Sequence, residues 1–326
     1  MSKKILITGA SGFVGYHLIR EALLQDFEVF AAVRKTSEVA HLADLPIRLV
    51  YPAFQNTDQL TRDLSLYGIT HIVHAAAVTK AANQKEYDYA NAILTRNLAL
   101  AAGRADIALE NFVFLSSLAA KGPSFNGQPI TEETPPHPVT FYGKSKLLAE
   151  NYLAEVDGIP LTGLRPTAVY GPREKDLFIV LKMIKQGWEL YIGRLQQRLS
   201  FVYVQDLVNV VFRTLAGPGR GSYYNVSDGE GYDRYALAQI TRSLLHKRTF
   251  RLHVPLGLVR AFLKIQNRLT PAAKASILNL DKLSELTASW ECSIEKLRCE
   301  LQYQPAYQLQ EGLSQTIGWY QQNKWF

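Results

Sequence analysis

The chain opens with a short apolar run that leads directly into three regularly spaced glycines, ILITGASGFVG, at residues 5–15. The apolar run predicts a buried strand, and apolar residues at helical spacing after the glycines predict a helix. Glycine lacks a Cβ atom, so a backbone with Gly9, Gly12 and Gly15 can turn tightly, approach a pyrophosphate and let the helix pack on the strand. The helix N-terminus then faces the anion. We therefore predict a nucleotide site at this first strand-to-helix turn.

Strand-like and helical patterns alternate through the first half of the chain. Apolar strands are expected at residues 28–33, 47–50, 71–75, 111–115 and 161–164, and helices between them include 87–102 and 141–153. Such alternation is typical of a parallel sheet with helices on both faces. The predicted fold class is α/β, with a doubly wound, Rossmann-type parallel sheet.

The alternation of strand-like and helical patterns becomes less regular after about Pro166. Helices are expected at residues 176–186, 204–215, 234–245 and 256–269, with short strands at 189–192, 199–203 and 222–226. We expect residues 1–165 to form the dinucleotide-binding domain. Residues 166–326 are expected to form mainly a smaller, mostly helical substrate-binding lobe, with segments from about 200–222 returning to the first domain.

The end of the second expected strand discriminates between the two nicotinamide dinucleotides. An Asp or Glu there accepts hydrogen bonds from the ribose hydroxyls of NAD, whereas an Arg meets the 2′-phosphate of NADP. This chain has Arg34 and Lys35 at that turn and no carboxylate. Because Arg34 can present a planar fork to a phosphate, we expect NADP rather than NAD. A solvated cationic turn is the alternative.

Tyr142 and Lys146 stand four residues apart in the stretch YGKSK, within the expected helix 141–153. Residues at this spacing lie on one helix face. An ammonium beside a phenol lowers the phenol pKa from about 10, which helps a tyrosine to exchange protons near neutral pH. The spacing is also ordinary on a helix surface, so the pair gains its meaning from the glycine turn that precedes it.

Composition excludes several classes of protein. The 326 residues carry a net charge of +7, yet Lys and Arg are scattered without a basic stripe interleaved with aromatics, so no nucleic-acid partner is expected. No apolar run is long enough to span a membrane, and no secretory signal is recognisable, so we expect a cytoplasmic protein. Only Cys292 and Cys299 are present, and we expect two reduced thiols and no metal site.

The expected helix 256–269 carries an apolar stripe beside Arg260, Lys264 and Arg268. Such a helix suits either a membrane surface or packing onto the substrate lobe or a partner subunit, and the second is favoured. The aromatic residues near the C-terminus, from Trp319 to Phe326, are likewise expected to pack together.

Taken together, these motifs resemble the extended short-chain dehydrogenase/reductase family. The resemblance covers nearly the whole chain and rests on the order and spacing of TGASGFVG at residues 8–15, HAAA at 74–77, SS at 116–117, YGKSK at 142–146, RPTAVYGP at 165–172 and FVYVQDL at 201–207. It implies that Tyr142 exchanges a proton with the substrate oxygen, that Ser117 hydrogen-bonds the same oxygen, and that Lys146 holds the nicotinamide ribose and lowers the pKa of Tyr142.

The resemblance also implies which residues contact the cofactor. They are Gly9, Ser11, Gly12, Phe13, Val14, Gly15, Arg34, Lys35, Ala75, Ala76, Ala77, Asn91, Tyr142, Lys146, Pro166 and Val169. Asn91 suits a helix surface nearly as well, and His74 is expected to pack or hydrogen-bond behind the site rather than to react. A homodimer contact through helices 87–102 and 141–153 is implied as well, although the same apolar faces are needed for packing on the sheet.

Departures from the family narrow the expected reaction. Sugar dehydratases of the family carry an Asp-Glu pair where this chain has Leu118 and Ala119, and sugar-nucleotide enzymes commonly carry Asn where it has Ala168. The loop around Ala168 looks more like the dihydroflavonol-reductase and hydroxysteroid-dehydrogenase branch. The leading interpretation is an NADP-dependent oxidoreductase acting on a carbonyl or alcohol carbon of a fairly apolar small molecule. The alternatives are an NDP-sugar epimerase or related sugar-nucleotide enzyme, for which Arg173 or Arg198 would hold the diphosphate, and a cofactor-binding protein without chemistry.

Overall fold

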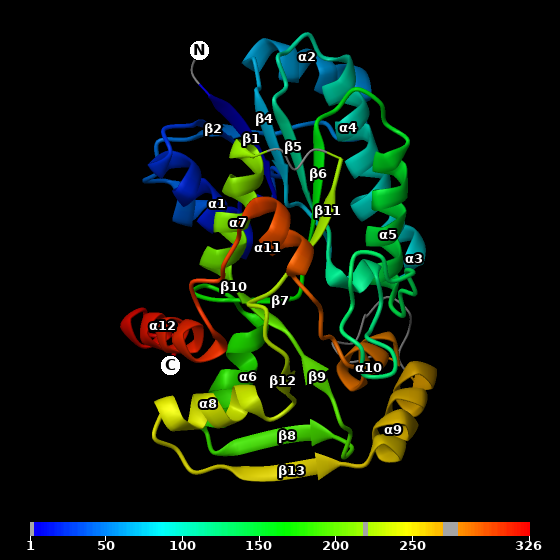
Figure 1. Cartoon of the computed structure of the whole chain (residues 1–326), viewed down its shortest axis with the longest axis vertical. Coiled ribbons are helices and arrows are strands. Elements are labelled where there is room, and N and C mark those ends of the chain that lie inside the picture. Colours follow the sequence, from blue (N-terminus) through cyan, green and yellow to red (C-terminus); the bar gives the residue numbers. More distant parts are fainter. Residues whose placement is uncertain (1–2, 218–220, 270–279) are drawn as a thin grey trace.

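A seven-stranded parallel sheet forms the centre of the larger lobe (Figure 1). The computed structural model describes residues 3–217, 221–269 and 280–326. The strand order is β11-β6-β5-β4-β1-β2-β3, and each neighbouring pair is parallel. The predicted Rossmann-type fold class is therefore confirmed. The strands are β1 (Lys4–Thr8), β2 (Glu28–Ala32), β3 (Arg48–Val50), β4 (His71–His74), β5 (Asn111–Leu115), β6 (Leu161–Pro166) and β11 (Tyr223–Val226).

Helices cover both faces of this sheet (Figure 1). One face carries α1 (Phe13–Leu24) and α7 (Val204–Ala216), and the other carries α2 (Thr57–Tyr67), α4 (Leu94–Arg104) and α5 (Phe141–Ala154). Ile5 and Ile7 of β1 belong to the first core and Leu6 to the second, because successive side chains of a strand point to opposite faces. The near-continuous apolar runs that predicted these strands result from burial on both sides.

The strand order reverses between β1 and β4, and this places the nucleotide crevice. From that point β2 and β3 extend in one direction and β5, β6 and β11 in the other. In such sheets ligands bind outside the carboxyl ends of the strands at the switch point. The glycine turn after β1 and the alanines 75–77 after β4 both lie at this position.

The helix expected at residues 87–102 is in fact three consecutive segments. They are α3 (Gln84–Asp88), a π-helical turn (Tyr89–Ile93) and α4. The π turn contains Asn91, which is 1% exposed and hydrogen-bonded to both polar groups of the Val78 backbone. The wider turn thus serves a buried polar side chain, and wide turns of this kind are frequent at functional sites.

The smaller lobe is built from the second half of the chain. Helices α6 (Asp176–Lys185), α8 (Ala236–Leu244) and α12 (Leu309–Gln322) pack around β7 (Ala168–Tyr170) and β10 (Phe201–Tyr203). The strand expected at 199–203 is interrupted at Ser200, so that β9 (Arg198–Leu199) pairs with β12 (Tyr232–Asp233) while β10 pairs with β7. The C-terminal aromatics pack as expected: Tyr320 and Trp325 stack with their ring centroids 5.2 Å apart.

The far end of the smaller lobe holds a two-stranded parallel sheet of β8 (Trp188–Ile192) and β13 (Phe250–Val254) (Figure 1). The helices α9 (Leu256–Leu269), α10 (Leu280–Thr287) and α11 (Glu295–Leu301) come next in the chain. Strand β13 was not expected from the sequence, although its residues alternate between apolar and polar; its apolar residues Phe250 and Leu252 are exposed rather than buried. The chain also returns to the sheet of the larger lobe, since α7 packs beside α1 and β11 pairs with β6.

Candidate active site

The glycine turn approaches two neighbouring pieces of backbone more closely than any side chain would allow. A Cβ atom on Gly15 would lie 2.1 Å from the carbonyl oxygen of Gly9, and one on Gly9 would lie 2.8 Å from that of Ala75. Gly9 also has φ +69°, in the left-handed region that favours glycine. The turn is therefore a narrow backbone cradle at the end of β1.

Helix α1 begins directly after this turn with its first amide groups uncapped. Its N-cap residue is Gly12, no side chain accepts a hydrogen bond from the first turn, and no acidic residue lies there. A helix start of this kind leaves N–H donors and positive dipole for an anion. The residues present therefore fit the pyrophosphate of a dinucleotide, and the predicted cofactor residues Ser11, Phe13 and Val14 lie around this turn.

A buried chain of hydrogen bonds runs from the end of β1 to helix α5. Thr8 Oγ1 contacts His74 Nδ1 at 2.7 Å, and His74 Nε2 contacts Thr95 Oγ1 at 2.8 Å. Thr95 donates to the carbonyl oxygen of Asn91, and the Asn91 amide donates to Ser145 Oγ at 3.0 Å. Ser145 in turn donates to the backbone oxygen of Tyr142 at 2.7 Å. The cofactor turn and the tyrosine are thus linked through buried hydrogen bonds.

The partners of His74 fix its tautomer and its charge. Thr95 uses its own hydrogen for Asn91, so it must accept from Nε2, and Nδ1 must then accept the hydroxyl hydrogen of Thr8. Thr8 Oγ1 also accepts from the backbone N–H of Ala76 at 3.1 Å. Burial lowers the pKa of His74 to about 3, so the ring is neutral. Through Thr8 it holds the alanine turn, residues 75–77 after β4, in place. His74 lies behind the site, as the sequence indicated.

Helix α5 rests directly on the turn after β5. A Cβ atom on Gly143 would lie 2.3 Å from the carbonyl oxygen of Ala119, so only glycine permits this approach. Thr140 caps the helix by accepting from Gly143 N at 3.0 Å. The close contact brings Tyr142 to Ser117, and the two side chains hydrogen-bond. Ser117 also accepts from the backbone N–H of Ala119 at 3.1 Å.

The pKa of Tyr142 is raised rather than lowered in this structure. Burial raises it to about 12, and the hydrogen bond with Ser117 acts in the opposite direction. The carboxylate of Glu285 on α10 raises it further. The pKa of Tyr142 is therefore set by burial, Ser117 and nearby acidic groups, and the expected lowering by Lys146 is not seen.

Lys146 is 1% exposed and points at the end of β5. Its Nζ donates to the carbonyl oxygen of Leu115 at 2.6 Å and lies 4.5 Å from the centre of the Phe114 ring. Burial lowers its pKa to about 7, while the Glu150 carboxylate raises it. A buried ammonium so close to deprotonation is typical of a functional group rather than of a surface pair.

One turn further along α5, Glu150 forms a buried ion pair. The guanidinium of Arg165 binds this carboxylate through two hydrogen bonds, from Nε to Oε1 at 2.9 Å and from Nη2 to Oε2 at 2.7 Å. Ser116 donates to the same carboxylate at 2.5 Å. Ser116 thus serves this ion pair, whereas Ser117 faces Tyr142, which separates the roles of the two neighbouring serines.

A segment of the smaller lobe covers the tyrosine side of the site. Besides Glu285, the backbone of residues 289–291 hydrogen-bonds the loop after Ser117: Ser124 N donates to Ser289 O and Ile130 N donates to Glu291 O. Cys292, a buried free thiol, packs there against Leu118. The catalytic candidates therefore lie where the two lobes meet.

The remaining predicted cofactor residues lie at the ends of β2 and β6 and in β7, and they differ in how far they are buried. Pro166 ends β6, and Val169 lies in β7. Val169 packs against the core beneath α1 and α7 and against the core of the smaller lobe. Between them, Thr167 Oγ1 is buried and has no hydrogen-bond partner among the described residues. Arg34 and Lys35 are exposed after β2, and Arg34 N donates to Ser37 Oγ at 3.1 Å.

The largest difference from the predicted cofactor residues concerns Asn91. It is neither a helix-surface residue nor a residue whose polar atoms are free for a ligand, because its side chain binds Val78 and Ser145. We assign it to positioning the alanine turn and α5. Glu150 and Ser145 were not singled out from the sequence. Glu150 lies four residues after Lys146, so the helix spacing that found Lys146 would also have found it.

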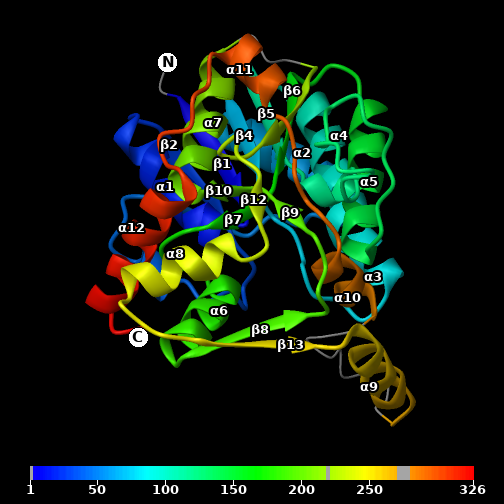
Figure 2. The same cartoon turned by 60° about the horizontal axis from the view of Figure 1, so that its bottom comes forward.

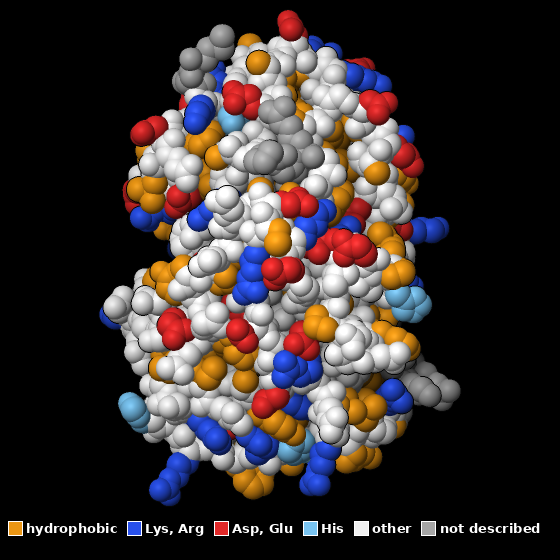
Figure 3. Space-filling view, in the orientation of Figure 1, with side chains coloured by type: hydrophobic (Ala, Val, Ile, Leu, Met, Phe, Trp, Pro, Cys, Tyr) orange, Lys and Arg blue, Asp and Glu red, His pale blue; other side chains and the backbone are white. Residues whose placement is uncertain are grey.

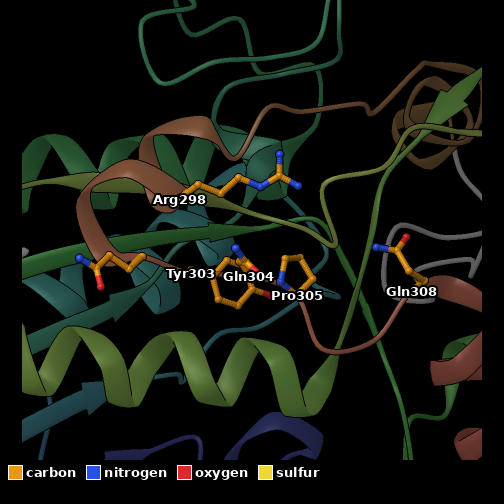
Figure 4. A pocket seen from close by; sticks show the side chains of 6 residues that line it. Arg298, Tyr303, Gln304, Pro305 and Gln308 are labelled. Atoms are coloured by element: carbon orange, nitrogen blue, oxygen red, sulfur yellow. The ribbon is translucent and has the colours of Figure 1, made fainter.

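A surface pocket lies elsewhere, between α11 and the start of α12 (Figure 4). Its volume is about 590 Å³, and none of the predicted site residues lines it. The lining residues are Arg298, Gln302, Tyr303, Gln304, Pro305 and Gln308. The pocket therefore plays no part in the assignment of the active site.

Comparison with known proteins agrees with this geometry. The family model described as "NAD dependent epimerase/dehydratase family" matches residues 5–227. The chain is 29% identical to a UDP-glucose 4-epimerase of Vibrio cholerae, covering 97% of this chain and 95% of that protein. It is 27% identical to the N-acetyl-alpha-D-glucosaminyl-diphospho-ditrans,octacis-undecaprenol 4-epimerase of Escherichia coli O157:H7, with the same shares covered. The structure of the Bordetella bronchiseptica enzyme WbmG in complex with NAD and UDP shares the fold, with a TM-score of 0.80 at 21% identity over 99% of this chain and 96% of that one.

The packing of α5 on Ala119 predicts the effect of a single methyl group. Gly143→Ala should lower the free energy of unfolding by about 1–3 kcal/mol, because the helix must move away from the carbonyl oxygen. Gly318→Ala in α12, where a Cβ meets nothing within 4 Å, is the matched control and should gain about 0.5–1 kcal/mol. Urea denaturation measures both. Equal effects of the two substitutions would contradict the close contact.

The buried ammonium predicts a gain in stability on its removal. Lys146→Met should raise the free energy of unfolding at pH 7 by about 1–4 kcal/mol, because no charge is then desolvated. The folded pKa of about 7 lies below the usual 10.5, so between these values the unfolded chain binds more protons and the stability of the parent rises with pH. The advantage of the variant should therefore shrink from pH 7 to pH 10. Exposed Lys144→Met is the control, and a pH-independent difference would refute the assignment.

Proposed function

Because this chain belongs to the NAD dependent epimerase/dehydratase family, we propose that it epimerises a sugar that is carried on a diphosphate. It is an NAD(P)-dependent enzyme of the extended short-chain dehydrogenase/reductase type. The observation that carries the proposal is the meeting of Ser117 and Tyr142 at the end of β5, with buried Lys146 beside them.

The two relatives named above support a sugar over an apolar substrate. Both are named as 4-epimerases, and the name of each identifies a sugar on a diphosphate, joined to uridine in one and to undecaprenol in the other. Both matches cover 97% of this chain. The leading interpretation from the sequence, an NADP-dependent oxidoreductase of an apolar compound, has less support than this alternative.

The residues of the site suit a reaction that removes and returns a proton on one substrate oxygen. A nicotinamide dinucleotide held at this site would supply the acceptor and donor of a hydride for the carbinol carbon. Tyr142 can take the hydroxyl proton only as a phenolate, and burial raises its pKa to about 12, so a nearby positive charge must lower that pKa before the proton is taken and later returned. Ser117 orients the same oxygen by a hydrogen bond. Lys146 would supply that positive charge when protonated; burial lowers its pKa to about 7, and its Nζ donates to the carbonyl oxygen of Leu115 at the end of β5.

Dehydration of the sugar is disfavoured by the residues immediately after Ser117. The short 3-10 helix Leu118–Ala120 is apolar, and Leu118 is 2% exposed in contact with Ile130 and Cys292. Removal of water from a sugar needs an acid for the leaving hydroxyl and a base for the carbon. Leu118 and Ala119 supply neither, so epimerisation is the better match.

Arg198 is our candidate for the diphosphate. It lies on β9 against the covering segment, where Trp290 N donates to its carbonyl oxygen at 2.7 Å, and Glu291 holds its side chain through two hydrogen bonds. Its side chain is still 53% exposed. Arg173, the other candidate from the sequence, stacks 4.2 Å from the centre of the Tyr16 ring on α1, which ties it to the cofactor end.

For the cofactor we propose NAD, against the expectation of NADP from Arg34 and Lys35. The structural neighbour WbmG was solved with NAD, and an enzyme that returns its hydride has no need of the reducing pool that NADP serves. Arg34 is exposed at its turn and suits the solvated alternative that the sequence left open. We also propose the division into residues 1–165 for the cofactor and mainly 166–326 for the substrate.

A homodimer through α3, α4 and α5 is a further proposal. Tyr89 and Ile93 lie on the π turn between α3 and α4 and are 50% and 39% exposed, and Phe141 lies on α5 and is 38% exposed. Large apolar side chains gathered on a helical face favour a partner of the same kind.

The proposed reaction is tested by supplying sugars on a diphosphate. With UDP-glucose or UDP-N-acetylglucosamine, proton NMR should show the 4-epimer accumulating to equilibrium without net reduction of NAD. Tyr142→Phe should lower the rate by about 100-fold to 10,000-fold and leave NAD binding intact, because only the proton carrier is lost. Tyr152→Phe on the same helix is the control. Consumption of NADPH with an apolar ketone and no interconversion of sugars would instead support the oxidoreductase.

The cofactor proposal is tested by calorimetric titration with NAD and with NADP. We expect NAD to bind at least as tightly as NADP, and Arg34→Ala to change the affinity for NAD by less than about threefold, since an exposed arginine makes little use of the ribose hydroxyls. A tenfold preference for NADP that disappears in Arg34→Ala would restore the expectation from the sequence.

A further inference from the structure

The sheet of β8 and β13 has its polar side chains facing the protein. Glu189 is 2% exposed and pairs with Arg251, whose Nε lies 2.9 Å from Oε2. On the same face, Tyr191 stacks on His253 with ring centroids 5.5 Å apart, and Tyr235 Oη contacts His253 Nε2 at 3.0 Å. The usual alternation, with apolar residues inward and polar residues outward, is therefore inverted.

The outward face of this sheet is apolar. Parallel pairing sets Trp188 beside Phe250 and Leu190 beside Leu252, and these four side chains are 49%, 61%, 48% and 42% exposed. Trp188 and Phe250 meet edge to face with ring centroids 5.7 Å apart. Burial within the chain does not explain this face, so its apolar character needs a partner outside the chain.

Helix α9 continues the same surface. It comes after β13 and Pro255 and projects from the body of the molecule (Figure 2). Leu258 and Phe262 on it are 64% and 62% exposed, while Leu263 is buried. With the four residues of the sheet, six of the seventeen large apolar side chains that are exposed in the described chain belong to this end of the molecule. We call these six the apolar end face.

Positive charge surrounds the apolar end face. From Arg234 to Leu280 the sequence contains nine Lys and Arg and no Asp or Glu, which exceeds the net charge of +7 of the whole chain. This stretch therefore carries more net positive charge than the rest of the sequence, although Glu189 pairs with two of its cations, Arg242 and Arg251. Lys247 and Arg248 precede β13 and Arg194 lies just after β8, and all three are exposed. Figure 3 shows Lys and Arg side chains gathered around this lower end.

We propose that the apolar end face binds the surface of an anionic lipid membrane. An apolar face with an exposed tryptophan and with exposed Lys and Arg side chains at its rim matches the boundary between acyl chains and negative headgroups. None of the described helices is long and apolar enough to cross a bilayer, so the contact is peripheral. A nucleic acid would leave the apolar side chains unused, and it would meet no aromatic-lined basic groove among the residues described here. The proposal stands independently of the proposed reaction.

Vesicle sedimentation with the full-length protein tests the proposal. The protein should sediment with vesicles of phosphatidylcholine and phosphatidylglycerol, much less with phosphatidylcholine alone, and binding should weaken with added salt. Lys247→Glu with Arg248→Glu should lower the partition coefficient at least about thirtyfold, since each lost cation is worth about fivefold. Phe250→Ser with Leu252→Ser should lower it about tenfold or more through lost apolar contact.

Matched substitutions at the opposite end of the molecule are the controls. Both controls lie on α2, at the other end of the molecule from β8 and β13 (Figure 1). They are Leu66→Ser, at a residue that is 80% exposed, and Arg62→Glu, and neither should change vesicle binding. Cooperative thermal unfolding and NAD binding show that each variant is folded. The proposal is overturned by absence of binding to anionic vesicles, by equal binding to neutral ones, or by equal losses in the controls. It is also overturned if sedimentation equilibrium shows a dimer that Phe250→Ser with Leu252→Ser dissociates, because a second copy would then cover the face.

Discussion

The buried hydrogen-bond chain between Thr8 and Tyr142 is the constraint on which the active site depends. It crosses from β1 through His74 on β4, Thr95 on α4 and the π turn at Asn91 before it reaches α5. Each donor in it has one acceptor, so no member can turn away without leaving a buried polar group unpaired. The glycine turn, our proposed cofactor site, and helix α5, which carries the proposed proton carrier Tyr142, are thereby held in one relative position. That coupling explains why a structural histidine and a π-helical turn lie at the switch point of the sheet.

Local features of the sequence were sufficient to predict the sheet and the centre of the site. The three glycines act through the absence of a Cβ atom, and the structure shows contacts of 2.1 Å and 2.8 Å that a Cβ would make at Gly15 and Gly9. Continuous apolar runs predicted the central strands because both of their faces are buried. The spacing of Tyr142 and Lys146 placed them on α5, but it could not show that burial would raise the pKa of one and lower that of the other.

Features that depend on distant contacts were beyond the sequence. The π turn exists because Asn91 binds Val78 and Ser145, which are 13 and 54 residues away. The role of Ser116 depends on Glu150 and Arg165, which only the fold brings beside it. Strand β13 was missed although its residues alternate, and the alternation alone could not have shown that the apolar face is the exposed one. The choice between NAD and NADP also depends on where the exposed Arg34 side chain meets a ligand, and a turn sequence does not fix this.

We propose that Tyr142, Ser117 and Lys146 support oxidation and reduction of one carbinol carbon of a sugar within a single binding event. The most direct measurement is the fate of deuterium placed on C4 of the sugar of UDP-glucose, followed by NMR and mass spectrometry during incubation with the enzyme and NAD. The account predicts that the 4-epimer forms with the deuterium retained at C4, because the hydride leaves and returns without contact with solvent. A product with hydrogen at C4, or no 4-epimer under conditions where NAD is bound, would contradict it.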